Sequence, residues 1–223
     1  MAKKEMGTII NKYSKLYTCA VSDAIDELGL EPGFVDAGIR PIYPGARMVG
    51  YAGTLKFIPS DEPLDDDVMA KLGPFIRKLP KFPIVCVDMS NQMIAAGLGQ
   101  STGRILQRLG VRGALVDGPV RDIAQVIDSK FPMFARGIIC SSVRGRMVID
   151  FDAVMKPINC GDRVINVGDL IFGDINGVVI VKQEHIKEVL EKTKEMISTD
   201  EWWFEQLEQG RDPSDIEKER PLP

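Results

Sequence analysis

Apolar residues near the N-terminus recur with the period of an α-helix. Ile9, Ile10, Tyr13 and Leu16 are spaced by about 3.6 residues, which predicts one helix. Ser22 is a candidate N-cap for a second helix, and Gly29 is its expected end. The turn-rich stretch at 30–46 separates these helices from the rest of the chain. The first thirty residues are therefore predicted to be helical.

The middle of the chain alternates between strand and helix patterns. Residues 48–57 alternate as a strand does, 82–87 read as a buried strand, and 113–116 as a short third strand. Helices are predicted over 65–79, where acidic residues are candidate caps, over 103–110, and from about 121 to 129 after a turn at 117–119. Such an alternation favours an α/β core with a partly parallel sheet.

Beyond Phe131 the pattern changes to strands separated by Gly, Asn and Asp, at 135–149 and 162–181. This style is closer to a β-sandwich or barrel than to a doubly wound sheet. We expect both halves to share one core. An amphipathic helix is predicted at 183–197. The domain organisation is therefore one domain at 1–200 and a C-terminal tail at 201–223.

Composition excludes several classes of protein. The chain has 223 residues, and 44% of them are hydrophobic, which is enough to bury a full core. Its 28 basic and 32 acidic residues give a net charge of −4, so we expect no nucleic-acid partner. The N-terminus lacks the apolar segment of a signal peptide, and no stretch approaches the roughly 18 apolar residues of a membrane span. We predict a cytoplasmic protein without membrane contact.

Histidine and cysteine usage limits the chemistry further. The single histidine, His185, leaves no site built from several histidine ligands, and a Ser-His-Asp triad would depend on that residue alone. The four cysteines lack CxxC spacing, so neither a zinc ribbon nor a thioredoxin motif fits. We expect reduced cysteines in the core and a surface position for His185.

The densest cluster of functional side chains is at 113–122. An apolar strand ends at Asp117 there, and a helix is predicted to open after Pro119. Ligands of α/β proteins bind where strand ends face helix starts. Arg121 in a first helical turn would oppose the helix dipole unless an anion offset it, so it is a candidate anion grip. Asp122 offers a hard oxygen ligand for Mg²⁺. The alternative is a solvated Arg-Asp helix cap.

A second cluster is the glycine-rich segment at 97–103. It resembles a nucleotide loop, but residues 90–96 separate it from the preceding strand, so the context of a dinucleotide site is missing. Its backbone N–H groups could instead approach a small carboxylate. The structural alternative is a tight turn with Ser101 as a helix N-cap.

Two further groups of residues suggest surfaces. Arg104, Arg108 and Arg112 share a predicted helical stripe, which is either a solvated face or a subunit contact. Trp202, Trp203 and Phe204 are interpreted as packing residues, because stacking on bases would also need a cationic groove.

Several of these segments together resemble one family. They are 19–29 (CAVSDAIDELG), 49–54 (VGYAGT), 111–126 (VRGALVDGPVRDIAQV), 131–137 (FPMFARG) and 158–181 (INCGDRVINVGDLIFGDINGVVIV). The chain resembles, over roughly residues 17–182, the RraA-like family of 4-hydroxy-4-methyl-2-oxoglutarate aldolases and regulators of RNase E activity. The resemblance implies an α/β fold of the three-layer β/β/α swivelling-domain type. It also implies homotrimers, or hexamers made of two trimers, with sites between subunits.

The resemblance also implies site residues. The family motif is an acidic residue, a 20-residue spacer, Arg-Asp, and an acidic residue three positions later. Arg121 and Asp122 match, so Arg121 would bind the substrate carboxylate and Asp122 would ligate Mg²⁺ or Mn²⁺ directly. The position expected to hold a metal-bound water is Gln100, and the later acidic position is Gln125; both depart from the motif. Leu98 and Gly99 fall in the loop whose amides would face a pyruvyl group.

Two functions from different classes follow from the resemblance. The first is a divalent-metal-dependent carbon-carbon lyase, an aldolase or decarboxylase of the class II pyruvate aldolase type. It would cleave a 4-hydroxy-2-oxo diacid or decarboxylate oxaloacetate to give pyruvate, with Arg121, Asp122 and Gln100 as catalytic residues. The presence of Asp122 favours this enzyme. The second is a non-catalytic regulatory trimer of the RNase E inhibitor type that binds a protein partner, which the two glutamines favour.

Overall fold

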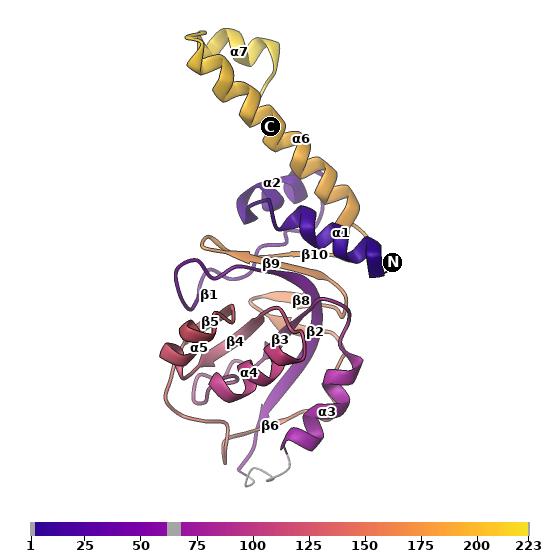
Figure 1. Cartoon of the computed structure of the whole chain (residues 1–223), viewed down its shortest axis with the longest axis vertical. Helices are drawn as coiled ribbons and strands as arrows, with labels where there is room; N and C mark the ends of the chain where they lie inside the picture. Colours follow the sequence, from indigo (N-terminus) through magenta and orange to yellow (C-terminus); the bar gives the residue numbers. More distant parts are fainter. Residues whose placement is uncertain (1–2, 62–67, 223) are drawn as a thin grey trace.

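A mixed sheet is the centre of the molecule (Figure 1). The computed structural model describes residues 3–61 and 68–222. The order of the main path of the sheet is β1 (Arg40–Pro41), β5 (Met133–Ile138), β4 (Ala114–Val120), β3 (Pro83–Asp88), β2 (Met48–Pro59), β9 (Leu170–Asp174) and β10 (Gly177–Val181). Strands β2, β3, β4 and β5 are parallel to one another, whereas β1 pairs antiparallel with β5, β9 with β2, and β10 with β9. The predicted partly parallel sheet is therefore confirmed.

Three layers can be assigned from the two faces of this sheet. The helical face carries α1 (Lys3–Tyr13), α2 (Thr18–Glu27) and α6 (Ile186–Glu208) over β2, β9 and β10, and α3 (Val68–Lys78), α4 (Gln100–Arg108) and α5 (Ile123–Ser129) beside β3 and β4. The hairpin of β7 (Ile158–Cys160) and β8 (Arg163–Ile165) covers the opposite face. This is the expected three-layer β/β/α arrangement.

The second helix begins earlier than its sequence indicates. Ser22 lies inside α2, and the N-cap position belongs to Tyr17. The cause is a tertiary contact, because Asp174 at the end of β9 accepts hydrogen bonds from the Thr18 N–H (2.8 Å) and Thr18 Oγ1 (2.7 Å). A carboxylate from elsewhere in the chain thus satisfies the helix start. The helix ends as predicted, before Gly29 with φ +66°.

Strand β4 is longer than predicted and removes the expected turn at 117–119. The chain stays in the sheet through Val120, with an irregularity in the pairing to β5 between Val116 and Pro119. Helix α5 therefore starts only at Ile123. Arg121 therefore lies in the connection before α5. The prediction that it belongs to a first helical turn is wrong.

Strands after Phe131 do not form a separate sandwich or barrel. Strands β5, β9 and β10 join the same sheet as β2 to β4, while β6 (Met147–Ile149) pairs with the far end of β2. Among residues 3–61 and 68–222, the second β layer consists of the β7–β8 hairpin. The strands of both halves of the chain thus belong to one sheet, and the sandwich-like pattern arises from antiparallel strands that extend a parallel sheet. The acidic cap candidates at 65–67 lie outside the described residues.

Helix α6 runs without interruption through residue 200 and extends away from the sheet, and α7 (Pro213–Glu219) packs against its far end (Figure 1). Trp203 is buried there, and its Nε1–H donates to the Arg220 carbonyl at 2.7 Å. The Arg220 guanidinium lies 5.6 Å from the centre of the Trp202 ring. The packing role predicted for both tryptophans is confirmed, but Phe204 is 63% exposed.

Other expectations about exposed residues need two corrections. Arg104 and Arg108 are exposed on α4, but Arg112 lies beyond that helix and its Nε–H donates to the Val49 carbonyl at 2.9 Å. Cys86 and Cys160 are buried as expected, whereas Cys19 and Cys140 are exposed; all four are free thiols. In residues 3–61 and 68–222, no helix is long and apolar enough to cross a membrane.

Candidate functional site

The glycine-rich segment at 97–103 and the cluster at 113–122 lie side by side where the parallel strands end. After β3 ends, the chain loops out and returns so that Leu98 forms a parallel bridge with Val120 of β4. The Gly97 N–H donates to the Pro119 carbonyl at 2.9 Å, and the Arg121 N–H donates to the Leu98 carbonyl at 3.1 Å. Hydrogen bonding therefore fixes the glycine-rich segment beside the Arg-Asp pair.

Asp122 has an unusual backbone conformation that directs its side chain to α4. Its φ and ψ of 61° and 42° are left-handed, a region that Asp tolerates better than most residues. Although Asp122 is the N-cap residue of α5, its side chain does not cap that helix. Instead, Oδ2 accepts a hydrogen bond of 3.1 Å from the backbone N–H of Gln100, the first residue of α4.

The same contact explains why the predicted cap at Ser101 is wrong. Helix α4 already begins at Gln100, with Gly99 as its N-cap. A glycine has no side chain to cap the helix, so the Asp122 carboxylate supplies the acceptor from another segment of the chain. Negative charge is also favourable at this helix end.

Gly99 allows two side chains to approach its backbone closely. A Cβ there would lie 2.7 Å from Asp122 Oδ2 and 2.9 Å from Arg121 Cγ, closer than real Cβ atoms pack. The Gly99 backbone is extended and unstrained, so the reason for glycine is the close approach of the two side chains.

Arg121 and Asp122 form a partly exposed ion pair. Arg121 Nε lies 3.6 Å from Asp122 Oδ2, and the two side chains are 40% and 37% exposed. Exposed pairs of this kind hold their partners only weakly. The guanidinium can therefore turn toward a bound carboxylate, and the second oxygen of Asp122 accepts no hydrogen bond from the described part of the chain.

The available ligands fit a water-rich Mg²⁺ or Mn²⁺ site and do not fit a closed protein cage. Within residues 3–61 and 68–222, no group of three His, Cys, Asp or Glu side chains could hold a metal ion. Mg²⁺, however, keeps several waters and often uses one or two protein carboxylates. Asp122 can provide one such carboxylate, and Gln100 lies beside it. Gln125 is exposed on α5, three residues after Asp122.

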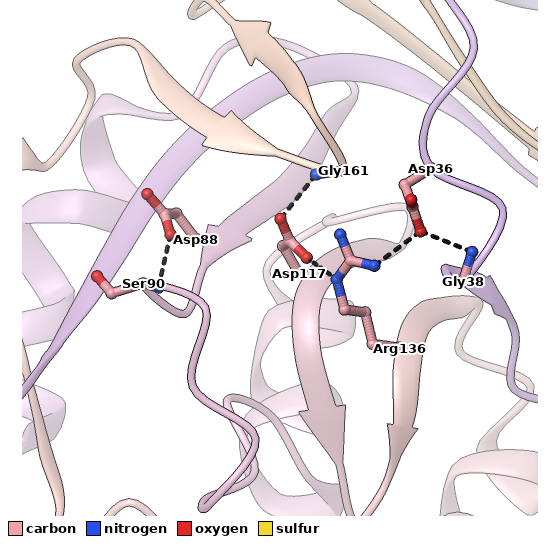
Figure 2. Close-up of polar contacts among 7 residues, drawn as sticks. All are labelled: Asp36, Gly38, Asp88, Ser90, Asp117, Arg136 and Gly161. Atoms are coloured by element: carbon pink, nitrogen blue, oxygen red, sulfur yellow. Dashed lines mark hydrogen bonds and ion pairs between the residues drawn. The ribbon is translucent and has the colours of Figure 1, made fainter.

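An ionic network near the same sheet edge was not predicted. Figure 2 shows Arg136 of β5 between Asp117 of β4 and Asp36, with Nε bonded to Asp117 and one terminal nitrogen 2.7 Å from Asp36 Oδ1. Asp117 also accepts the Gly161 N–H at 2.7 Å. The Gly38 N–H and Arg136 together lower the pKa of Asp36. These contacts join β4, β5, the β7–β8 turn and the 34–39 segment.

Asp88 lies beside this network and has its own partners. It is the direct register partner of Asp117 across β3 and β4. Its Oδ1 accepts the Ser90 N–H at 2.6 Å (Figure 2), and its Oδ2 lies 3.4 Å from Lys56 Nζ. Each buried carboxylate thus has a separate cation, which indicates a structural role. The sequence signal for Asp88 and Asp117 was that each is an acidic residue at the end of an apolar strand.

Cys86, Cys160 and His185 have surroundings of their own, apart from the Arg121–Asp122 pair. Burial raises the pKa of the Cys86 and Cys160 thiols, which disfavours their reactive thiolate forms. His185 is the N-cap residue of α6, partly buried, with Nδ1 3.1 Å from Glu188 Oε2. Of the residues predicted for the site, the structure brings together Leu98, Gly99, Gln100, Arg121 and Asp122.

Comparison with known proteins gives related sequences over most of the chain. The RraA-like (Aldolase/RraA) family model matches residues 18–180. The protein DlpA of Legionella pneumophila is 28% identical over 200 residues, which are 88% of this chain but 32% of DlpA, so the chain spans about a third of that relative. A Halalkalibacterium halodurans protein, provisionally named a 4-hydroxy-4-methyl-2-oxoglutarate aldolase, is 28% identical over 86% of this chain and 85% of its own.

A solved structure supports the fold. Streptomyces coelicolor RraAS2, described as an unusual member of the RNase ES inhibitor RraA protein family, superposes with a TM-score of 0.78. It covers 90% of this chain and 98% of its own length at 20% identity. The shared architecture is therefore that of the RraA-like proteins.

Replacing Gly99 tests the close approach at the site. We expect Gly99→Ala to displace Asp122 from the start of α4, so that the Gln100 amide exchanges with solvent at least tenfold faster in hydrogen-exchange NMR. Gly137→Ala is the matched control, because its Cβ would meet only Met93 Cε at 3.6 Å. Unchanged protection of Gln100 in Gly99→Ala would contradict the geometry.

Proposed function

Since the chain belongs to the RraA-like family, we propose that it is a divalent-metal-dependent lyase that forms pyruvate from a small 2-oxo acid. The substrate class is a 4-hydroxy-2-oxo diacid, cleaved by retro-aldol reaction, or oxaloacetate, which is decarboxylated. The observation that carries this proposal is the Arg121–Asp122 pair held against Gly99 and Gln100. This junction combines a cation for a substrate carboxylate (Arg121, here called the carboxylate grip), a hard oxygen ligand (Asp122) and the backbone donors of the glycine-rich segment.

Each residue at this junction has a defined task in such a reaction. Arg121 neutralises and orients the substrate carboxylate. The backbone N–H groups of Leu98 and Gly99 would donate to a pyruvyl oxygen. Asp122 would hold Mg²⁺ or Mn²⁺, and Gln100 would position a bound water through its amide. The ion, when bound, supplies Lewis-acid stabilisation of charge that develops on the 2-oxo group.

Removing the proposed metal ligand tests this activity. We expect the protein to release pyruvate from oxaloacetate or from a 4-hydroxy-2-oxo diacid with Mg²⁺ or Mn²⁺, and EDTA to abolish the reaction. Asp122→Ala should lower kcat/KM at least a hundredfold, as measured in a coupled pyruvate assay. Asp128→Ala, an exposed aspartate on α5, is the control. Full activity of Asp122→Ala in the presence of chelator would refute the proposal.

A second candidate function is a regulatory oligomer that binds a protein partner without catalysis. Its support is the pair of glutamines at positions 100 and 125, which lack the negative charge that the family motif provides there. The family also contains RNase inhibitors, such as the Streptomyces protein compared above. Metal affinity separates the two candidates, because only the lyase needs the ion.

Restoring a carboxylate at position 100 should reveal whether this residue faces the metal. We expect Gln100→Asp to bind Mn²⁺ about tenfold more tightly in titration calorimetry, since an added anion near a dication strengthens its binding. Gln107→Asp, on the same helix α4 but away from Asp122, is the control. Equal or weaker affinity in Gln100→Asp would place Gln100 away from the ion or indicate a metal-free site.

We further propose that the chain forms a homotrimer or a hexamer with sites at subunit boundaries. Phe204 and Leu207 are 63% and 39% exposed on the part of α6 that extends beyond the sheet (Figure 1). Arg104 and Arg108 offer an exposed basic face on α4 to acidic residues of a neighbouring copy. Apolar surface on an extended helix is most simply covered by another subunit.

Light scattering tests the assembly. We expect a mass of three or six chains at micromolar concentration, and a shift toward monomers in Phe204→Glu with loss of activity. Glu201→Gln, a neighbouring exposed position, should leave the mass unchanged. A stable monomer near 25 kDa with full activity would rule out a site shared between subunits.

A further inference from the structure

An apolar cavity lies between the sheet and helices α3 and α4. Its volume is about 140 Å³. Leu55 and Val85 line it from the sheet, Phe75 from α3, and Leu106 from α4. The polar groups of the Arg121–Asp122 site do not line it. The cavity is therefore a space distinct from the carboxylate grip.

The size and lining of the cavity define what it can hold. Thr102 is its only lining residue with a polar side chain among the described residues; the others are aliphatic, aromatic, methionine or glycine. An enclosed, engineered apolar cavity of about 150 Å³ binds benzene, and this pocket, which is partly open to solvent, offers a similar volume. Water would find too few hydrogen-bond partners here to be held strongly. A hydrocarbon group of about six carbons fits both the volume and the chemistry.

The wall of the cavity is shared with the carboxylate grip. Gly97 and Leu98 line the cavity, and the next two residues, Gly99 and Gln100, contact Asp122. Consecutive Cα atoms are about 3.8 Å apart, so only one or two residues of chain separate the cavity from the ion pair. Thr102, in the first turn of α4, also lines the cavity.

We propose that this cavity binds an apolar group of about six carbons immediately behind the carboxylate grip. The group has two possible sources, which are the hydrocarbon chain of a 2-oxo acid outside the diacids named above or a separate small apolar molecule. The first source rests on the proposed lyase function, whereas the second does not. Either source gives the site a selectivity for apolar groups that the Arg121–Asp122 pair alone does not provide.

Two probes distinguish these sources on the purified full chain. Benzene, titrated by NMR, tests the cavity alone, and we expect saturable shifts of residues around Leu98 and Leu106. Pyruvate and 2-oxooctanoate, titrated by calorimetry with Mn²⁺, test a tethered tail. Burial of a methylene is worth about 0.8 kcal/mol, so a buried tail should tighten binding roughly fourfold per methylene.

Variants of α4 provide the controls. Leu106→Phe should fill the cavity and abolish benzene binding, whereas Leu109→Phe, at an exposed position on the same side of the sheet, should not. Thr102→Val removes the single hydroxyl at equal volume and should bind benzene at least as tightly as the parent chain. This variant keeps the test decisive if Leu106→Phe fails to fold.

The outcomes separate this inference from the proposed function. Tighter binding of 2-oxooctanoate that is lost in Leu106→Phe identifies the tail of a substrate, and benzene binding without that preference identifies a separate ligand. Benzene binding without pyruvate binding refutes the lyase but supports the cavity site. The inference is overturned if two results hold in both the parent chain and Thr102→Val. Benzene does not bind, and 2-oxooctanoate binds no more tightly than pyruvate.

Discussion

The buried carboxylate of Asp117 is the constraint on which the layers of this protein depend. A charge taken out of water is stable only when it is paired and hydrogen-bonded. Arg136 and the Gly161 N–H meet this requirement from β5 and from the β7–β8 turn. The Gly161 bond fixes the hairpin layer against the sheet, and Arg136 joins the 34–39 segment to the same network through Asp36. The neighbouring Asp88 has Lys56, so the two aligned carboxylates do not share one cation.

This anchoring leaves β4 free to continue past Asp117 as a paired strand. Its last residues pair on one side with β5 and on the other with the returning segment at 97–98. The backbone therefore determines where Arg121 and Asp122 leave the sheet. Gly99 then allows their side chains to approach α4. The candidate site thus depends mainly on strand pairing and on one missing side chain, rather than on a flexible loop.

Local patterns predicted the elements well, and tertiary contacts explain where they failed. Alternation and helical periodicity located β2, β3, α4 and α6, and the glycine-rich segment is hydrogen-bonded to Arg121 and Asp122, with which the motif groups it. The caps at Ser22 and Ser101 were wrong because Asp174 and Asp122, distant in sequence, serve those helix starts. The Arg136 network was missed for the same reason, since its members are separated by 19 to 100 residues.

The number of residues in helix α6 determines where the C-terminal aromatic residues lie. Its 23 residues span about 34 Å, and each residue turns the helix by about 100°. Leu190 packs against the body of the protein, whereas Trp203 packs with α7 at the far end. One residue inserted between them would swing the whole distal end, including Phe204, by about 100° without a change at the sheet. The length of α6 thus sets the direction of the distal end independently of the sheet.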